Sequence, residues 1–327
     1  GARPSYQLPH PHRGADLMTI YGIDIIALIA SMMVAATPIL LAATGEMIAE
    51  KSGVLNLGVE GMMIVGAICG FAAAVSSGSP VLGFVAAAVG GAVMALLFAI
   101  LTQYLLSNQV ATGLALTMFG LGLSALIGQG YQGVKPPMTE KINMGFLSDL
   151  PIVGPTLFHH DWMVYLSLLL VAATWAWLKY ARGGLVLRAV GENHDAAHAL
   201  GYRVIRVRIL ALIFGGALAG LGGAYLSLVR VPQWTEGMTA GAGWIALAIV
   251  VFASWRAERV LLGAYLFGGV TVLQLRLQAA EIAIPVQVLS MAPYLITILV
   301  LVIMSAPRGK AALSAPAALG RVFHASN

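Results

Sequence analysis

The sequence predicts an all-α, polytopic membrane protein, a bundle of about eight to ten transmembrane helices with some broken or re-entrant segments. Of its 327 residues, 59% are hydrophobic and only 9% are charged, and the mean hydropathy is +0.89. Soluble domains contain about half apolar residues at most. The apolar stretches are continuous, whereas the strands of an outer-membrane barrel alternate over about ten residues. The backbone must therefore satisfy its hydrogen bonds within helices.

Apolar length and helix breakers place the membrane segments in order along the chain. Several runs lack Lys and Arg and approach the roughly 20 residues that a helix needs to span a bilayer. The shorter runs are bounded by Gly, Asn or charged residues. The predicted segments are 24–43, 59–76, 81–105, 109–128, 161–180, 207–229, 241–255, 260–280 and 286–304. We expect residues 1–23 to form a tail, with Met18 as a candidate native start, and 24–305 to form the transmembrane domain.

Basic residues predict which loops face the cytoplasm. The loop 181–208 holds several arginines opposed by only Glu192 and Asp195, and the tail 306–327 is also basic. Both are therefore predicted to be cytoplasmic. The long polar, Pro-containing segment 129–160 lies one span earlier and is predicted to be external. The arginines of the first loop are Arg182, Arg188, Arg203, Arg206 and Arg208.

The side of the N-terminus depends on whether every segment spans. Nine complete spans put it outside, and one re-entrant or broken segment puts it inside. The candidate breaks are 45–63 and 105–113, because each interrupts apolar sequence with Asn and Gly. Both alternatives stay open at this point.

Composition and motifs exclude several classes of function. The net charge of +5 belongs to the predicted cytoplasmic loops and indicates no nucleic-acid partner. The single cysteine, Cys69, excludes an internal disulfide and a CxxC site. No P-loop motif is present, and the GAGWIA stretch at 241–246 follows no strand. His194 and His198 have the i, i+4 spacing of metal ligands but no third ligand nearby. We therefore predict no catalytic, cofactor or metal site.

The stretch GEMIAEKSGVLNLGVEGMM, residues 45–63, concentrates polar groups between two apolar runs. A carboxylate at membrane depth is costly unless it is paired or hydrated, so Asn56 and Glu60 are predicted to lie inside the bundle on the substrate pathway. The other charged residues, Glu46, Glu50 and Lys51, are expected in a loop in contact with cytoplasmic water. Three glycines leave room for unwound backbone: Gly53, Gly58 and Gly61.

A second polar cluster, Asn108, Gln109 and Thr112, begins another apolar helix. Transporters place substrate sites near the midplane where helices break. Uncharged amides and hydroxyls suit a neutral polar solute such as a sugar or a nucleoside. These residues are therefore further candidates for the substrate pathway.

The predicted cytoplasmic loop contains an amphipathic segment between Gly191 and Gly201. Its alanines and Leu200 offer small apolar contacts, and its polar residues are expected to face outward. A short projecting helix of this kind suits docking into a groove of a partner. The outward residues are Glu192, His194, Asp195 and His198.

The chain resembles the permease subunits of bacterial ABC importers that serve ribose, branched-chain amino acids and purine nucleosides. It is most similar to the second permease of nucleoside and simple-sugar systems. The likeness covers about residues 24–305. It departs from the family pattern at Ser254, where relatives commonly have Gly, and at Ala257, where Pro is frequent. The motifs that carry it are AEKSGVLNLGVEGMM at 49–63, AVGENHDAAHALGYRV at 189–204, GWIALAIVVFASWR at 243–256 and GAYLFGG at 263–269.

The resemblance implies a multi-pass protein of the bacterial inner membrane that works by alternating access. Its partners would be a second permease in a heterodimer, a cytoplasmic ABC ATPase and an extracytoplasmic solute-binding protein. The chain would bind no cofactor, since ATP and magnesium are used by the ATPase. The family's coupling helix falls on Gly191, Glu192, Asn193, Ala196, Ala197 and Gly201.

The function that follows is the import of a nucleoside or simple sugar by the permease subunit of an ATP-driven importer. Two alternatives remain within transport: an ABC permease for branched-chain amino acids, and a secondary transporter or channel independent of an ATPase. A membrane-embedded enzyme would need a cluster of acids or histidines, which the sequence does not show.

Overall fold

The computed structural model describes residues 19–20, 23–142, 153–279, 285–305 and 315–324. Apart from two-residue antiparallel strands, β1 (Thr19–Ile20) and β2 (Ile23–Asp24), these residues form helices and their connections. The α-helices are α1 (Ile25–Lys51), α2 (Val59–Ser77), α3 (Pro80–Ala99), α4 (Gln109–Gly128), α5 (Val153–Leu157), α6 (Trp162–Tyr180), α7 (Arg182–Glu192), α8 (His194–Ala199), α9 (Val204–Tyr225), α10 (Ala242–Phe252), α11 (Ala257–Ala279) and α12 (Val286–Ser305). Residues 1–18 of the predicted tail lie outside the described part.

The predicted fold class is confirmed. Among the described residues, seven helices are long and apolar enough to cross a membrane. Helix α12 is 20 residues long and carries no charged residue, whereas α10 has only 11 residues. Each of the nine predicted segments coincides with one of these helices, but the segment predicted at 241–255 is a half-length helix.

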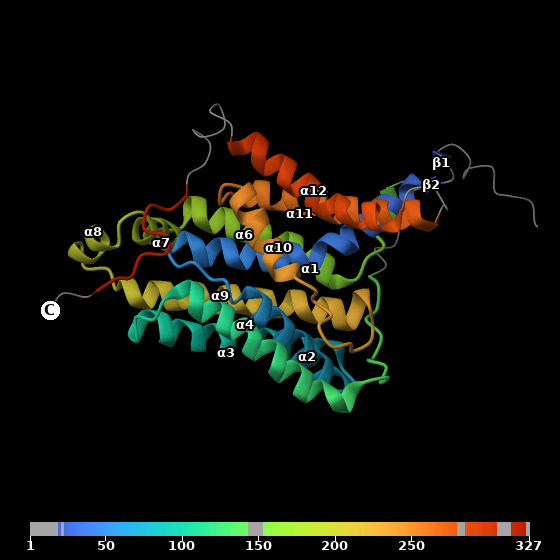
Figure 1. Ribbon diagram of the computed structural model, residues 1–327, viewed down its shortest axis with the longest axis horizontal. Helices are drawn as coiled ribbons and strands as arrows, with labels where there is room; N and C mark the ends of the chain where they lie inside the picture. The colour runs from blue at the N-terminus through green and yellow to red at the C-terminus, as the bar shows by residue number, and fades with distance from the viewer. Residues whose placement is uncertain (1–18, 21–22, 143–152, 280–284, 306–314, 325–327) are drawn as a thin grey trace, which may run out of the picture.

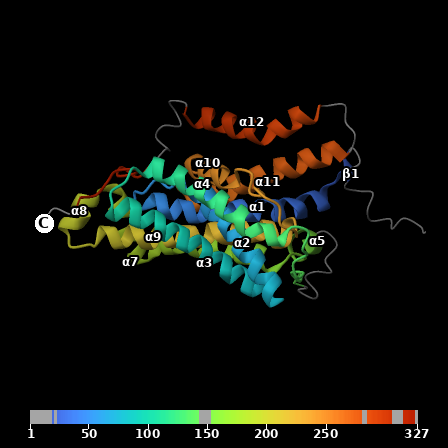
Figure 2. The same cartoon turned by 60° about the horizontal axis from the view of Figure 1, so that its bottom comes forward.

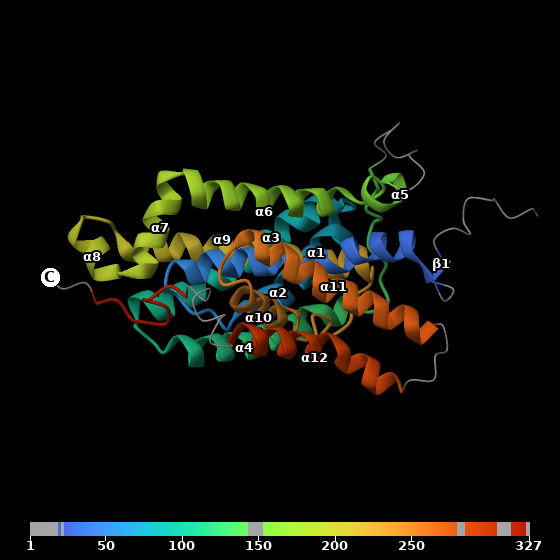
Figure 3. The same ribbon diagram turned by 90° about the horizontal axis from the view of Figure 1, so that it is seen from above.

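Helix α9 lies in the middle of the bundle and packs against α1, α2 and α3 (Figure 1). Helix α1 also contacts α11, and α12 lies beside α11 on the outside (Figure 2). Seen from above, α6 forms one edge of the molecule and α4 and α12 lie at the other (Figure 3). One end carries α7, α8 and the C-terminal residues, and the opposite end carries β1 and α5. We call them the α8 end and the α5 end.

The central helices cross with their backbones in contact, because glycines lie at the crossing points. A Cβ atom on Gly66 of α2 would meet the backbone of Gly220 on α9, and one on Gly91 of α3 would meet Gly216. Within lipid, helices associate through van der Waals packing and not through the hydrophobic effect, and small residues allow the close approach.

Three interruptions divide the helices near functional residues. The non-helical residues Ser52–Gly58, here called the break segment, connect α1 to α2, and all of them except Leu55 and Leu57 are buried. Gly53 has φ of +90°, a backbone conformation that favours glycine. Helix α3 ends in a π-helical turn, Ile100–Tyr104, before α4 begins. The break segment lies within the predicted break 45–63, and the non-helical residues 105–108 after the π-helical turn lie within the predicted break 105–113. The third, 231–241 before α10, was not predicted.

Candidate functional site

The break segment is held inside the bundle by side chains from two helices. Asn56 is 1% exposed; its Nδ2 donates to Glu46 Oε2 of α1 at 2.9 Å, and its Oδ1 accepts from the Gly58 N–H at 3.1 Å. From α4, Gln109 Oε1 accepts from the Leu55 N–H at 2.8 Å. Backbone groups that leave a helix inside a membrane protein need such partners. Polar contacts inside the bundle therefore hold the break segment in place.

Glu60 lies in the first turn of α2 and is 4% exposed. One carboxylate oxygen accepts from Thr239 Oγ1 at 2.6 Å and from the Gly241 N–H at 3.0 Å, and the other accepts from the Gly243 N–H at 2.6 Å. These donors surround the start of α10. The N-terminus of a helix carries free N–H groups and a partial positive charge, which favour an anion there. The carboxylate thus joins α2 to α10 without an ion-pair partner among the described residues.

A cavity of about 430 Å³ with a mixed polar and apolar lining, here called the polar cavity, adjoins this carboxylate through Thr239, which both lines the cavity and hydrogen-bonds to Glu60. Its volume falls within the range of about 300–1,000 Å³ that small-molecule sites occupy. A second cavity, of about 600 Å³, lies between α6, α7 and α9 and is lined almost entirely by apolar side chains. The first cavity therefore suits a polar solute better. Its polar lining consists of Arg230, Thr235, Thr239, Thr271, Gln274 and Tyr294.

The structure does not bring all five predicted pathway residues together. Asn56 belongs to the break segment, Gln109 contacts that segment, and Glu60 lies beside the cavity. Asn108 is exposed, and its Oδ1 caps α4 by accepting from the Ala111 N–H at 3.0 Å. Thr112 shares a hydrogen bond of 2.8 Å with Ser107 in the same turn. None of the five lines the polar cavity itself.

The prediction that Glu46 and Glu50 touch cytoplasmic water is wrong. Both lie in the last turns of α1, and they are 1% and 0% exposed. Glu46 accepts from Asn56, and Glu50 Oε2 accepts from Trp255 Nε1 at 2.6 Å. Helix α1 continues to Lys51, and the break segment and the loop after α10 cover its end. Lys51 is half-buried.

Ser254, the position that departs from the family pattern, has φ of +50° and lies in the loop between α10 and α11. It is 1% exposed, and its hydroxyl has no hydrogen-bond partner among the described residues. A non-glycine residue in the left-handed region costs about 1–2 kcal/mol. Glycine would remove both this strain and the unpaired hydroxyl.

We therefore expect Ser254→Gly to stabilise the folded protein by about 1 kcal/mol, since the flexibility of glycine in the unfolded chain offsets part of the gain. The measurement is the thermal unfolding midpoint in detergent. Ser254→Ala serves as the control, because it removes the hydroxyl and keeps the strained Cβ. An unfolding midpoint for Ser254→Gly no higher than that of Ser254→Ala would contradict the strain argument.

The predicted amphipathic segment forms two helices with a sharp turn between them. Helix α7 ends at Glu192, and Asn193 begins α8, its Oδ1 accepting from the Ala196 N–H at 3.0 Å. Gly191 is buried against the Lys51 carbonyl of α1. Gly201 follows α8 with φ of +88°, and no described atom lies within 4 Å of the position that a Cβ atom would take there. The segment thus projects from the α8 end of the bundle.

The predicted orientation of this segment is only partly right. Glu192, Asp195 and His198 are exposed, but His194 is 8% exposed and turns inward. Ala197 is buried within the chain at 2%, while Ala196, Ala199 and Leu200 are exposed, Leu200 at 76%. The apolar surface that α8 offers to a partner therefore consists of these last three residues.

His194 and His198 contact protein groups. His194 Nδ1 lies 3.2 Å from Arg208 Nη2, and the rings of both histidines contact Phe323, with centroid separations of 5.4 and 5.3 Å. The described residues include no group of three or more His, Cys, Asp or Glu side chains that could hold a metal ion.

Sequence reasoning missed two groups, the Thr239–Gly243 turn that binds Glu60 and the buried Arg208. The turn was detectable as the Gly-rich interruption MTAGAG before an apolar run. Arg208 was counted among the surface arginines of the cytoplasmic loop, and no local signal distinguishes it. Its burial depends on segments that are distant in the sequence.

Comparisons with known proteins agree with this architecture. A family model described as "Branched-chain amino acid transport system / permease component" matches residues 28–305. The putative glucose ABC transporter permease protein TsgC13 of Haloferax volcanii is 44% identical over 82% of this chain and 88% of its own length. The nucleoside permease NupC of Lactococcus lactis subsp. cremoris and the guanosine permease NupQ of Bacillus subtilis are each 31% identical over 84% of this chain and 90% of their lengths. No solved structure matches the chain.

Two of these organisms also have a second, more distant relative, TsgB13 at 25% identity and NupP at 24%. The family match extends over most of the chain, and the relatives are matched over nearly their full lengths. The expectation of a multi-pass permease subunit of an ABC importer is confirmed: the chain belongs to the family of permease components of branched-chain amino acid transport systems.

Proposed function

We propose that this chain moves a nucleoside or a simple sugar across the cytoplasmic membrane, as one of two permease subunits of an importer driven by a separate ATPase. The observation that carries the proposal is the polar cavity of about 430 Å³ whose lining residue Thr239 is hydrogen-bonded to Glu60. Relatives named for glucose, nucleoside and guanosine transport support the same solute class.

The cavity chemistry suits a solute rich in hydroxyl groups. Among the described residues, its polar lining is mostly neutral hydroxyls and an amide, with Arg230 as the one cationic residue. Such groups both donate and accept hydrogen bonds, as ribose and hexose hydroxyls require. The walls otherwise consist of apolar side chains such as Phe267 and Ile245, which can contact a sugar ring or a base.

The α8 end is proposed to receive the ATPase. The exposed residues Ala196, Ala199 and Leu200 form a small apolar surface on a helix that projects from the bundle. An amphipathic helix of this type docks into a groove on its partner. The arginines of 181–208 support a cytoplasmic position for this end. Binding and hydrolysis of ATP with magnesium would take place in that partner and not in this chain.

The α5 end would then face the outside and meet the solute-binding protein. Helix α1 begins at the α5 end and runs toward the α8 end (Figure 3), so Ile25 would lie near the outer side. The pairs TsgC13 with TsgB13 and NupQ with NupP, each from one organism, support a second, different permease subunit.

The test is solute uptake into proteoliposomes that contain this chain, its second permease and the ATPase, with the binding protein outside and ATP inside. Guanosine, glucose and leucine are offered separately. We expect uptake of guanosine or glucose that requires ATP. Leucine as the only solute taken up would favour a branched-chain amino acid importer, and uptake by this chain alone without ATP would indicate a channel or secondary transporter; either result overturns the proposal.

A further inference from the structure

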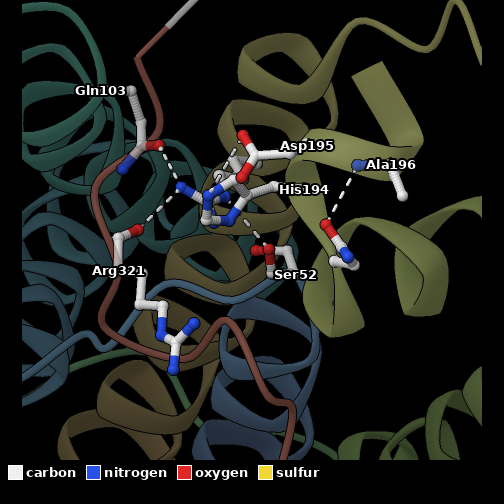
Figure 4. A network of polar contacts seen from close by, with 8 residues as sticks. Ser52, Gln103, His194, Asp195, Ala196 and Arg321 are labelled. Carbon is white, nitrogen blue, oxygen red and sulfur yellow. Dashed lines mark hydrogen bonds and ion pairs between the residues drawn. The ribbon is translucent and has the colours of Figure 1, made fainter. Parts of the chain in front are cut away.

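One buried arginine connects four separate segments of the α8 end. Arg208, on α9, is 0% exposed. Its Nε donates to the Ser52 carbonyl at 3.2 Å, and its Nη1 donates to Gln103 Oε1 at 3.4 Å and to the Arg321 carbonyl at 3.1 Å. Its Nη2 lies 3.2 Å from His194 Nδ1 of α8. Figure 4 shows Ser52, Gln103, His194 and Arg321 converging from four directions.

Among the described residues, no carboxylate forms an ion pair with the guanidinium of Arg208. The one ion pair in the described part of the chain joins His194 to Asp195, at 3.7 Å. A buried cation without a counter-ion is costly unless hydrogen bonds compensate for its lost hydration, and four acceptors surround Arg208 here. Arginine provides five N–H donors in a rigid planar fork, so the positions of its acceptors are tightly specified. A displacement of α8 therefore changes the contacts that hold Ser52.

The C-terminal segment, residues 315–324, ties the same elements together a second time. The Ala318 N–H donates to the Gly191 carbonyl at 2.9 Å, and the Gly320 N–H donates to the Gly53 carbonyl at 3.0 Å. Gly191 belongs to α7, which leads into α8, and Gly53 belongs to the break segment. This segment thus bridges the same two regions as Arg208.

Phe323 anchors the end of this segment against α8. It is 5% exposed and packs with Val190, Ala197 and Val204 in a small hydrophobic cluster. Its ring also contacts both histidines of α8 edge to face. The inner face of α8 is therefore covered by the chain's own C-terminal residues, while its outer face stays exposed.

We propose that Arg208 is the positioning residue that transmits movement of α8 to the break segment. Residues 315–324 provide a second connection between these two regions. The route continues from Ser52 through the break segment to Glu60, at the start of α2, and then to Thr239 beside the cavity. This inference rests on the proposed function, in which α8 receives the ATPase.

The test compares Arg208→Lys and Arg208→Met with Arg206→Met, an exposed arginine two residues away on the same helix. The readout is the number of solute molecules imported per ATP hydrolysed by the complete complex in proteoliposomes. We expect both Arg208 variants to lower this ratio about tenfold, within the range typical of coupling free energies, because lysine cannot reach all four acceptors. Arg206→Met should keep the wild-type ratio. A wild-type ratio in Arg208→Met overturns the inference.

Removal of residues 315–327 provides a second variant if the Arg208 variants do not assemble. It removes the Arg321 carbonyl and keeps the Ser52, Gln103 and His194 acceptors of Arg208. We expect a smaller fall in the same ratio, with the ATPase still bound to the complex. An unchanged ratio in this truncated protein would refute the role of the contacts between residues 315–324 and the rest of the α8 end. Failure of the proposed function itself would be seen separately, as an absence of ATP-dependent uptake by the wild-type complex.

The pH profile provides a readout that a purely structural role would not change. Burial lowers the pKa of His194, and the neighbouring Arg208 of α9 and Arg321 of the C-terminal segment lower it further, while Asp195 raises it. The imidazole is therefore neutral at neutral pH. Its stabilising contribution is present above the ordinary histidine pKa of about 6.5 and is lost as pH falls through the lower pKa of the folded state.

We expect the imported solute per ATP to fall over this acidic range in the wild type, because protonated His194 repels the guanidinium and can no longer accept its hydrogen bond. His194→Gln does not titrate, so its ratio should not change over the same range. An equal acid-induced fall in solute imported per ATP by His194→Gln would show that the pH dependence arises elsewhere. It would contradict the role of the His194–Arg208 contact.

Discussion

Replacing Glu60 with glutamine is expected to lower the stability of the folded protein by about 3 kcal/mol, because hydrogen bonds to a charged acceptor are worth about 1.5–3 kcal/mol each. Glutamine retains one acceptor oxygen and turns an NH₂ group toward donors at the start of α10. At least one of the three donors, Thr239 Oγ1 and the Gly241 and Gly243 N–H groups, is then left unpaired. The measurement is thermal unfolding in detergent, together with solute uptake.

Glu258→Gln is the matched control, because Glu258 is exposed in the first turn of α11. It should leave the unfolding midpoint unchanged. Thr239→Val removes one donor to Glu60 and leaves two, so its cost should be smaller, about 1 kcal/mol. An unfolding midpoint of Glu60→Gln equal to that of Glu258→Gln would show that the carboxylate does not hold α2 to α10.

Replacing Gly220 with leucine is expected to prevent assembly of the bundle. A Cβ atom there would meet the Ala87 carbonyl of α3 and lie 3.2 Å from Gly91 Cα, and on its other side Gly220 contacts Gly66 of α2. Overpacking a core costs about 1–3 kcal/mol when side chains can move. Here the neighbours are backbone atoms of two helices, so the cost is larger.

The matched control is Gly122→Leu on α4, where nothing lies within 4 Å of an added Cβ. The measurement is the yield of monodisperse protein in size-exclusion chromatography and its unfolding midpoint. We expect Gly122→Leu to give the yield and unfolding midpoint of the wild type, and Gly220→Leu to give no monodisperse protein. Normal yield and stability of Gly220→Leu would refute the close crossing of α2, α3 and α9.

The sequence predicted the helices and two of the three interruptions because both depend on local composition. Continuous apolar runs leave the backbone no alternative to helix, and Asn and Gly between such runs indicate a break. Asn56 and Glu60 are buried at 1% and 4% exposure, as polar groups embedded in an apolar sequence suggested. Their role on the substrate pathway stays a prediction.

Contacts between distant segments explain what the sequence did not reveal. Glu46 and Glu50 follow an apolar run and resemble interfacial acids, but the break segment and Trp255, about 200 residues later, cover them. His194 turns inward because Arg208 and Phe323 meet it there. Hydropathy also cannot show that α10 is a half-length helix, since the turn that precedes it is held by Glu60.

The central claim is that nucleotide-driven movement at α8 opens and closes the polar cavity. The only cysteine in the chain, Cys69, can be replaced by serine, and a cysteine then placed at the cavity-lining position Thr271. The rate at which an impermeant maleimide labels it from outside is measured in the complete complex, with and without ATP. The control adds Leu200→Glu, which places a charge on the exposed apolar surface of α8.

We predict that the labelling rate changes with nucleotide in the Thr271→Cys protein and is constant when Leu200→Glu is also present. This result would connect α8 to the cavity across the length of the bundle. A labelling rate that is the same in every nucleotide state, or a nucleotide dependence that persists with Leu200→Glu, would contradict the account.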